Sequence, residues 1–428
     1  MTETDSFACP RDRHLFGPGP KRVLALDGGG VRGAITVAFL ERIETLLSRH
    51  HGKDVRLGDW FDLVGGTSTG ALIAGALALG YRTADVRDFY IHRAATAFKR
   101  PFWRIPVFQA KFDTRALRKE IEDVVQDREL QSHDLITGLC IVSKRMDTGS
   151  PWIVANNPRA PYWSTPPDGS RIGNERFKLA NLVRASTAAP HFFDPEILPI
   201  LEDTSQDRLA DMRAAARKYP WLAQLLLSAV ARFGLNRAAV FNPQTDGLFV
   251  DGGVTPHNNP SLALFMMTQL KPFGICWPAD PQRLAITSIG TGTHRPRLAF
   301  DKLGIGRLPR LAFHALLSLM SDAERLVLTQ MQWFGECVAP WEIDSEIRDM
   351  SGDAPPGGKM FRFLRYDLRL EQDWLRKHLD VDLDEREVIS YRCMDDPEII
   401  PKIYELGQRA AEKQVKIEHW VGEAATKI

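Results

Sequence analysis

Short apolar runs alternate along this chain with longer segments whose apolar residues recur at helical spacing. The first pair is typical: residues 23–26 are all apolar, and residues 34–47 carry apolar side chains at positions 35, 39, 43 and 46. The first kind of pattern predicts a buried strand and the second a helix. Further strands are expected at residues 63–64, 136–143, 248–250, 284–289 and 361–370, and further helices at 71–79, 83–96, 114–125, 179–185, 207–219, 221–233, 261–270, 307–337 and 398–421.

This alternation of strands and helices predicts an α/β fold of three α/β/α layers around a mostly parallel central sheet. Residues 1–20 are expected to be a flexible lead-in, residues 21–295 the main domain, and residues 296–428 a mostly helical C-terminal extension packed on it. Residues 203–235 form a predicted helical insertion, which could be a lid, a membrane-facing element or part of the core. The basic and aromatic residues at 99–108 predict an irregular loop, either packed on the core or touching lipid head groups.

Composition narrows the class of protein. The 428 residues include 55 Lys and Arg against 54 Asp and Glu, so the net charge of +1 gives no overall attraction for nucleic acid. The five cysteines are scattered and form no C-x-x-C pair, which favours reduced thiols in the cytoplasm and no structural zinc. The chain shows neither a secretory signal nor an apolar run near the ~18 residues of a spanning helix, so we expect a soluble or peripheral membrane protein.

The sequence Gly66-Thr67-Ser68-Thr69-Gly70 lies between a predicted strand and a predicted helix. It fits the G-x-S-x-G pattern, in which a tight turn holds a nucleophilic serine at the end of a strand. Glycines two residues to either side are needed because the turn leaves no room for side chains there. A strand-to-helix turn that merely uses small residues is the alternative. The catalytic interpretation requires a base and an oxyanion site elsewhere in the chain.

The glycine run Asp27-Gly28-Gly29-Gly30-Val31-Arg32-Gly33 also joins a predicted strand to a helix. Three interpretations apply: a dinucleotide-binding fingerprint, a plain turn, or an oxyanion site made of backbone N–H groups. The fingerprint expects the second strand to end in an acidic residue about 20 residues on. Here that strand ends at Ser68 instead, which favours the oxyanion site.

Asp251 follows the predicted strand 248–250 and precedes Gly252 and Gly253, so it can approach another loop closely. It could take the Ser68 proton itself, as in a dyad, or it could orient a histidine, as in a triad. The candidates for that histidine are His294, His314, His378 and His419. His257 is nearer in sequence, but we expect it to have a structural role.

Four segments in this order resemble the patatin-like phospholipase family: residues 27–33, residues 66–70, Ala185-Ser186-Thr187-Ala188-Ala189-Pro190, and Asp251-Gly252-Gly253. The resemblance implies that residues 21–295 are a catalytic domain with Ser68 as nucleophile and Asp251 as general base. It also implies an oxyanion hole from the N–H groups of Gly28, Gly29 and Gly30, with Arg32 helping to hold that loop. Gly66, Gly70, Gly252 and Gly253 would support the motifs, and neither a metal nor a cofactor is implied.

The activity implied by the resemblance is that of a serine esterase that degrades lipids, cleaving acyl esters of glycerophospholipids at a membrane surface. Some bacterial members of the family act in phage defence and are switched on by a cyclic dinucleotide, so a gated, membrane-degrading effector is the main alternative. An esterase with a Ser-Asp-His triad and a dinucleotide-dependent enzyme are weaker alternatives. No nucleic-acid partner is expected, and a nucleotide activator and a homo-oligomer are left open.

Overall fold

The computed structural model describes residues 7, 9–93, 112, 114–190, 192–201, 242, 245–295 and 307–421, without the side chains of 307–310 and 312–317. The loop expected at 99–108 and the insertion expected at 203–235 lie outside the described residues. Within the described ranges, no helix has the length and apolar character needed to cross a bilayer.

The described strands form one nine-stranded sheet with the order β5-β6-β3-β2-β1-β7-β9-β8, and β4 pairs with β3 off this path. The strands from β3 to β8 in this order are all parallel, whereas β4 and β6 run antiparallel to β3. Their bounds are β1 (Lys21–Leu26), β2 (Leu63–Thr67), β3 (Gly138–Arg145), β4 (Ser150–Ala155), β5 (Glu196–Pro199), β6 (Asp246–Asp251), β7 (Leu284–Ile289), β8 (Gly335–Ala339) and β9 (Phe361–Tyr366).

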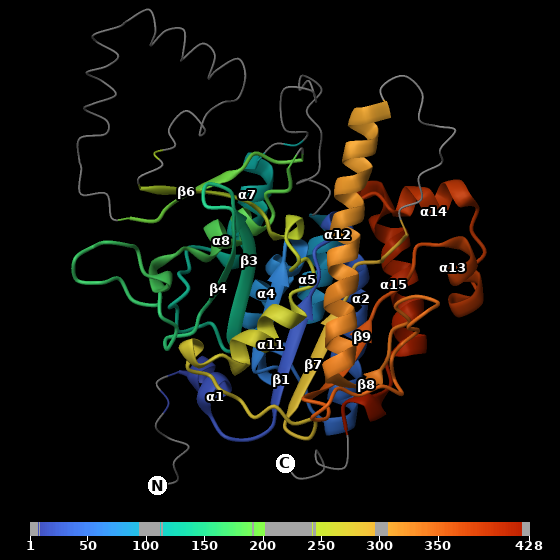
Figure 1. Cartoon of the computed structure of the whole chain (residues 1–428), viewed down its shortest axis with the longest axis horizontal. Coiled ribbons are helices and arrows are strands. Elements are labelled where there is room, and N and C mark those ends of the chain that lie inside the picture. The colour runs from blue at the N-terminus through green and yellow to red at the C-terminus, as the bar shows by residue number, and fades with distance from the viewer. Residues whose placement is uncertain are drawn as a thin grey trace, which may run out of the picture.

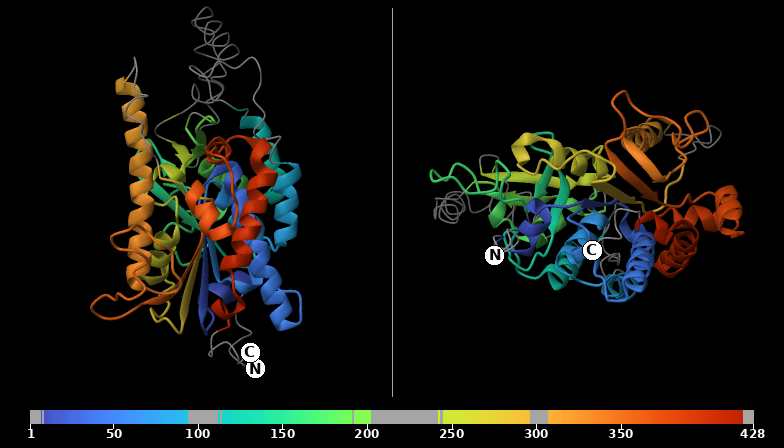
Figure 2. Two further views of the ribbon diagram at one scale, coloured as in Figure 1. Left: turned by 90° about the vertical axis from the view of Figure 1, so that its right-hand side faces the viewer. Right: turned by 90° about the horizontal axis from the view of Figure 1, so that it is seen from below.

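Helices cover both faces of this sheet (Figure 1). One layer contains α2 (Gly33–His51), α3 (Leu57–Trp60), α4 (Thr69–Ala78), α5 (Thr83–His92), α7 (Thr114–Val125), α8 (Leu179–Ser186), α13 (Gln372–Leu379), α14 (Glu385–Tyr391) and α15 (Ile400–Gln414). The other contains α1 (Pro10–Phe16), α11 (Ser261–Gln269) and α12 (Arg307–Phe334). Figure 2 shows the yellow and orange helices α11 and α12 across the sheet from the blue and red ones.

The sheet separates two hydrophobic cores, and β1 contributes to both. Leu24 and Leu26 pack with α2 and α4, whereas Val23 and Ala25 pack with α11 and the last turns of α12. Successive side chains on a strand point to opposite faces, so a wholly apolar strand is what a sheet covered on both sides requires. The predicted α/β/α fold with a mostly parallel sheet is therefore confirmed.

The C-terminal extension is less helical than predicted. β9 falls within the strand expected at 361–370, but β8 was missed because residues 307–337 were expected to be mostly helical. Both strands continue the parallel sheet beyond β7. Helix α15 packs on α2 so closely that a Cβ on Gly407 would lie 3.0 Å from the Cβ of Ala38. The extension is thus part of the central sheet and of its covering layer.

Candidate active site

Ser68 lies at the sharp turn between β2 and α4, with φ 55° and ψ −122°. This is a left-handed region that non-glycine residues rarely adopt, and holding a residue there costs ~1–3 kcal/mol. The two flanking glycines allow the turn to close. A Cβ on Gly66 would lie 2.1 Å from the carbonyl carbon of Gly70, and one on Gly70 would lie 2.3 Å from the carbonyl oxygen of Leu26. The serine is therefore held at the end of a strand by close backbone packing.

The Ser68 hydroxyl donates a hydrogen bond to Asp251, with 2.7 Å between Oγ and Oδ2. The other carboxylate oxygen, Oδ1, accepts the N–H of Gly253 at 2.7 Å. Burial raises the pKa of the Asp251 carboxyl to about 6, although the hydrogen bonds from Ser68 and Gly253 act to lower it. Asp251 is thus a fixed, buried carboxyl in direct contact with the serine hydroxyl.

The pairing of β3 explains how residues 183 positions apart come to touch. β2 pairs along one edge of β3 as far as Thr67 opposite Val142. Because β4 pairs along the other edge, β6 must share the edge used by β2, and its pairing begins with Asp251 opposite Ser143. The carboxyl ends of β2 and β6 therefore meet head to head. Asp251 lies at a strand end, as expected, and β6 is one of the antiparallel strands of the mostly parallel sheet.

The segment at the end of α8 hydrogen-bonds to the backbone N–H groups of both Ser68 and Asp251. The N–H of Ser68 donates to the hydroxyl oxygen of Ser186 at 2.8 Å, and this hydroxyl donates to the carbonyl of Val142 at 2.6 Å. The N–H of Asp251 donates to the carbonyl of Ala188 at 3.0 Å. This segment is one of the four that carry the family resemblance, which assigns it no role. Its contacts indicate that it aligns the turn at Ser68 with the end of β6.

The glycine loop after β1 approaches Ser68 closely, since a Cβ on Gly28 would lie 3.1 Å from the Cβ of Ser68. The Gly28 N–H, however, already donates to the carbonyl of Asn258 at 3.2 Å. Among the described residues, the N–H groups of Gly29 and Gly30 have no acceptor. Of the three glycines expected to form an oxyanion site, Gly29 and Gly30 thus keep N–H groups that are available to a substrate oxygen, whereas the Gly28 N–H is already bonded within the protein.

Arg32 closes the short helical turn Gly30–Arg32 after the glycine loop, and its N–H donates to the carbonyl of Gly29 at 3.2 Å. Its side chain is 7% exposed, and its Nε and Nη1 atoms have no hydrogen-bond partner among the described residues. Burial lowers the pKa of the guanidinium, whereas the nearby carboxylates of Asp367 and Glu324 raise it. Arg32 thus contacts the backbone of the glycine loop and lies near the carboxylates of Asp367 and Glu324.

The histidine side chains that the structure describes supply no base to Ser68 or Asp251. Among the described residues, no histidine ring hydrogen-bonds to Ser68 or Asp251. His419 pairs with the hydroxyl of Tyr366 and His378 stacks on Trp374, while the side chain of His314 lies outside the described residues. Burial and two nearby arginines lower the pKa of His294 to about 4. His257 supports the turn through its backbone, since its carbonyl accepts the Thr67 hydroxyl at 2.6 Å.

Three carboxylates, Asp27, Glu324 and Asp367, are close enough together to suggest a metal site. The guanidinium of Arg365 lies among them, with Nη2 2.7 Å from an oxygen of Asp27, 2.7 Å from one of Asp367 and 3.5 Å from one of Glu324. The protein's own cation therefore sits where a metal ion would bind, and this donor set does not fit a metal centre.

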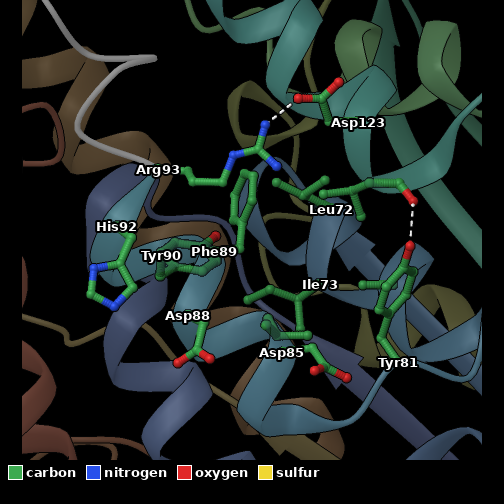
Figure 3. Close-up of a pocket in the computed structure, with 13 residues that line it drawn as sticks. Leu72, Ile73, Tyr81, Asp85, Asp88, Phe89, Tyr90, His92, Arg93 and Asp123 are labelled. Carbon is green, nitrogen blue, oxygen red and sulfur yellow. Dashed lines mark hydrogen bonds and ion pairs between the residues drawn. The ribbon is translucent and has the colours of Figure 1, made fainter.

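A cavity of about 390 Å³ lies between α4, α5 and α7 (Figure 3). Leu72 and Ile73 line it from α4, and the ion pair between Arg93 and Asp123 lies at its rim. Tyr90, which also lines the cavity, hydrogen-bonds through its hydroxyl to Thr69, the residue after Ser68. Burial raises the pKa of Tyr90 far above its usual value, so this hydroxyl stays neutral. The cavity is thus linked to the helix that begins at the serine.

Comparison with known proteins gives similar sequences in bacteria and plants. The chain is 32% identical over 181 residues to the cGAMP-activated phospholipase of Escherichia coli (strain TW11681), covering 41% of this chain and 48% of that protein. It is 31% identical over 186 residues to the cGAMP-activated phospholipase of Vibrio cholerae, covering 41% and 49%. Patatin-like protein 2 of Arabidopsis thaliana is 23% identical over 307 residues, covering 65% and 61%.

The chain thus spans about half the length of the bacterial relatives it matches. Among solved structures, VipD from Legionella pneumophila matches at 10% identity with a TM-score of 0.33, covering 91% of this chain and 67% of that one, a likeness too weak to inform on function. The sequence model of the family described as "Patatin-like phospholipase" matches residues 24–265. This match covers more than half of the chain and includes all four motif segments, and the chain therefore belongs to the patatin-like phospholipase family.

Proposed function

We propose that this protein is a serine lipid acyl hydrolase of the phospholipase A type, which cleaves fatty-acyl esters of glycerophospholipids. The observation that carries the proposal is the 2.7 Å hydrogen bond between Ser68 Oγ and Asp251 Oδ2, formed at a strained turn. A serine hydroxyl is a weak nucleophile until a base within hydrogen-bond reach takes its proton. Family membership supports the same reaction.

In the proposed reaction, ionised Asp251 accepts the hydroxyl proton while Ser68 Oγ bonds to the acyl carbonyl carbon. The negative charge that develops on the carbonyl oxygen is held by the N–H groups of Gly29 and Gly30. Collapse of this intermediate breaks the ester bond, and Asp251 returns the proton to the departing lysolipid alkoxide. A water molecule then gives a proton to Asp251 and attacks the acyl-enzyme. The fatty acid leaves, and Ser68 recovers its proton.

The pKa of about 6 suits Asp251 to this role. A general base works best when it is mostly ionised at the working pH and yet as basic as that allows. At pH 7 a carboxyl with this pKa is roughly nine-tenths ionised, and it binds a proton about a hundredfold more tightly than an exposed aspartate. Burial thus makes a carboxylate a stronger base while leaving it charged.

The test combines labelling of the serine with a fluorophosphonate probe and release of fatty acid from phospholipid liposomes. Wild type is compared with Ser68→Ala, Asp251→Asn and a control, Ser170→Ala, at an exposed serine. We expect labelling and hydrolysis in wild type and in the control. We expect neither in Ser68→Ala, and no hydrolysis in a folded Asp251→Asn. A wild type that is unlabelled under all conditions would refute a serine hydrolase, and an active Asp251→Asn would point to a histidine base.

We further propose that a cyclic dinucleotide switches this activity on, because relatives named as cGAMP-activated and cUMP-AMP-activated phospholipases match 41% of the chain. The same assays with and without cGAMP or cUMP-AMP test this second proposal. Activity that appears only with a nucleotide supports gating, whereas full activity on liposomes without one contradicts it. In either case we place the enzyme in the cytoplasm, with the membrane surface as its substrate.

A further inference from the structure

Arg365 on β9 is the centre of a buried ion network behind the glycine loop. Its side chain is fully buried, and it joins Asp27, directly before Gly28, to Asp367 with 2.7 Å contacts to both carboxylates. Glu324 on α12 approaches the same guanidinium at 3.5 Å. Arg365, Asp367 and Glu324 all lie beyond residue 265, where the family match ends. The glycine loop belongs to the region that the family model matches, whereas these three charged residues do not.

The network also reaches the other side of the loop. Nη1 of Arg365 donates to the hydroxyl of Ser288 at 2.8 Å, and this hydroxyl donates to Oδ1 of Asn259 at 3.3 Å. The carbonyl of the adjacent Asn258 accepts the N–H of Gly28 at 3.2 Å. Arg365 therefore restrains the residues that hold the loop at Asp27 and at Gly28, and Glu324 holds Arg365 from α12.

Asp367 fixes a second loop that packs against the first. Its Oδ1 accepts the N–H of Gly292 at 2.9 Å, and a Cβ on Gly290 would lie 2.1 Å from its Oδ2. Between these two glycines, the hydroxyl of Thr291 donates to the carbonyl of Gly28 at 2.9 Å. A Cβ on Gly29 would lie 2.2 Å from this hydroxyl oxygen. The glycine loop therefore has little room to shift while Asp367 stays in place.

We propose that Arg365 and Glu324 are positioning residues, which hold the N–H groups of Gly29 and Gly30 where the oxyanion forms. This inference rests on the proposed function. Neither side chain contacts Ser68 in the described structure, so both act through the loop. The loss of Arg365 would leave the carboxylates of Asp27 and Asp367 buried without their shared counter-charge, and such groups move apart or draw in water. A displacement of ~1 Å at a site of this kind lowers the rate by about a hundredfold.

The test uses Arg365→Met, Arg365→Lys and Glu324→Gln, each with a matched control. Arg362→Lys changes an arginine on the same strand, and Asp322→Asn removes an acidic charge from an exposed position on the same helix as Glu324. For each protein, kcat and KM are measured on phospholipid liposomes. Exhaustive fluorophosphonate labelling counts the reactive Ser68 sites, so that kcat is expressed per competent site, and thermal melting reports stability.

We expect Arg365→Met to lower kcat per labelled site about a hundredfold and Glu324→Gln about tenfold, with KM within roughly threefold of wild type, because oxyanion donors act mainly in the transition state. Arg365→Lys should recover part of the loss. A purely structural role would lower the melting temperature and the labelled fraction but leave kcat per site unchanged. That result for Glu324→Gln and Arg365→Lys, both of which keep the packing, would overturn this inference alone. A wild type that neither labels nor hydrolyses lipid would overturn the proposed function and this inference together.

Discussion

Replacement of Asp251 by asparagine should stabilise the fold while abolishing hydrolysis. The asparagine keeps the shape of the side chain and can accept from Gly253 with its oxygen while its amide donates to Ser68 Oγ. What it removes is a negative charge buried at 5% exposure. Burial raises the pKa of this carboxyl from 3.8 to about 6, which means that the folded protein resists its ionisation.

The sign and the size of the expected change in the free energy of unfolding follow from this pKa shift. A carboxyl whose pKa is higher in the folded state than in the unfolded state contributes stability that is fully present below pH 3.8 and is lost as the pH rises to about 6. The difference of 6 and 3.8 is about two pKa units, or ~3 kcal/mol at about 1.36 kcal/mol per unit. The side chain introduced by Asp251→Asn is neutral at every pH. The free energy of unfolding of this variant should therefore exceed that of wild type by up to this amount above pH 7, and by ~1.5 kcal/mol at about pH 5.

Urea unfolding at pH 8 and pH 5 measures both values, and Asp322→Asn, at an exposed position, controls for the general loss of one charge. We expect a gain for Asp251→Asn that is about twice as large at pH 8 as at pH 5, and no such trend in the control. A variant that is less stable than wild type at pH 8, or a gain that does not change with pH, would show that burial of the charge is not what sets the stability of this site.

Three further outcomes follow from the same geometry. The kcat/KM for lipid should fall about tenfold per pH unit below ~6 and stay level up to pH 8, because Asp251 must be ionised to accept the proton. A fall in kcat/KM that begins near pH 7 would instead indicate a histidine base. Ser186→Ala removes the acceptor of the Ser68 N–H and should lower kcat about tenfold or more, with most of the protein still folded by circular dichroism. Gly66→Ala places a Cβ 2.1 Å from Gly70 and should cost at least ~3 kcal/mol in urea unfolding, whereas Gly352→Ala, where nothing lies within 4 Å, should change little.

The parts of the site that could be predicted from sequence are those in which backbone geometry restricts residue type. Gly66 and Gly70 are glycines because the backbone passes where their Cβ atoms would lie, so the pattern around Ser68 reports the turn directly. Strands β1, β2, β3, β6, β7 and β9 were predicted for a similar reason, since a sheet covered on both faces needs apolar runs, whereas β4, β5 and β8 were missed. Local sequence carries this information because the restriction is itself local.

What could not be predicted depends on contacts between distant segments. The direction of β6 is set by its pairing with β3, and a run of apolar residues reads the same in either direction. The N–H of Gly28 looked equivalent to those of Gly29 and Gly30 until the structure placed the carbonyl of Asn258 next to it. The hydroxyl of Ser186 gave no signal of its own, since small polar residues are common at the ends of helices.

The ion network around Arg365 is another set of contacts between segments that are distant in the sequence. Asp27 precedes the glycine loop, and burial raises the pKa of its carboxyl well above the usual range, while the cation beside it acts to lower that pKa. That cation, Arg365, comes from a strand outside the family match. A chain could therefore keep all four motif segments and still lack the charge that balances them. For this protein the segments establish the family. We propose that the placement of the oxyanion donors depends also on Arg365 of β9 and Glu324 of α12, so experiments on activity should include those elements.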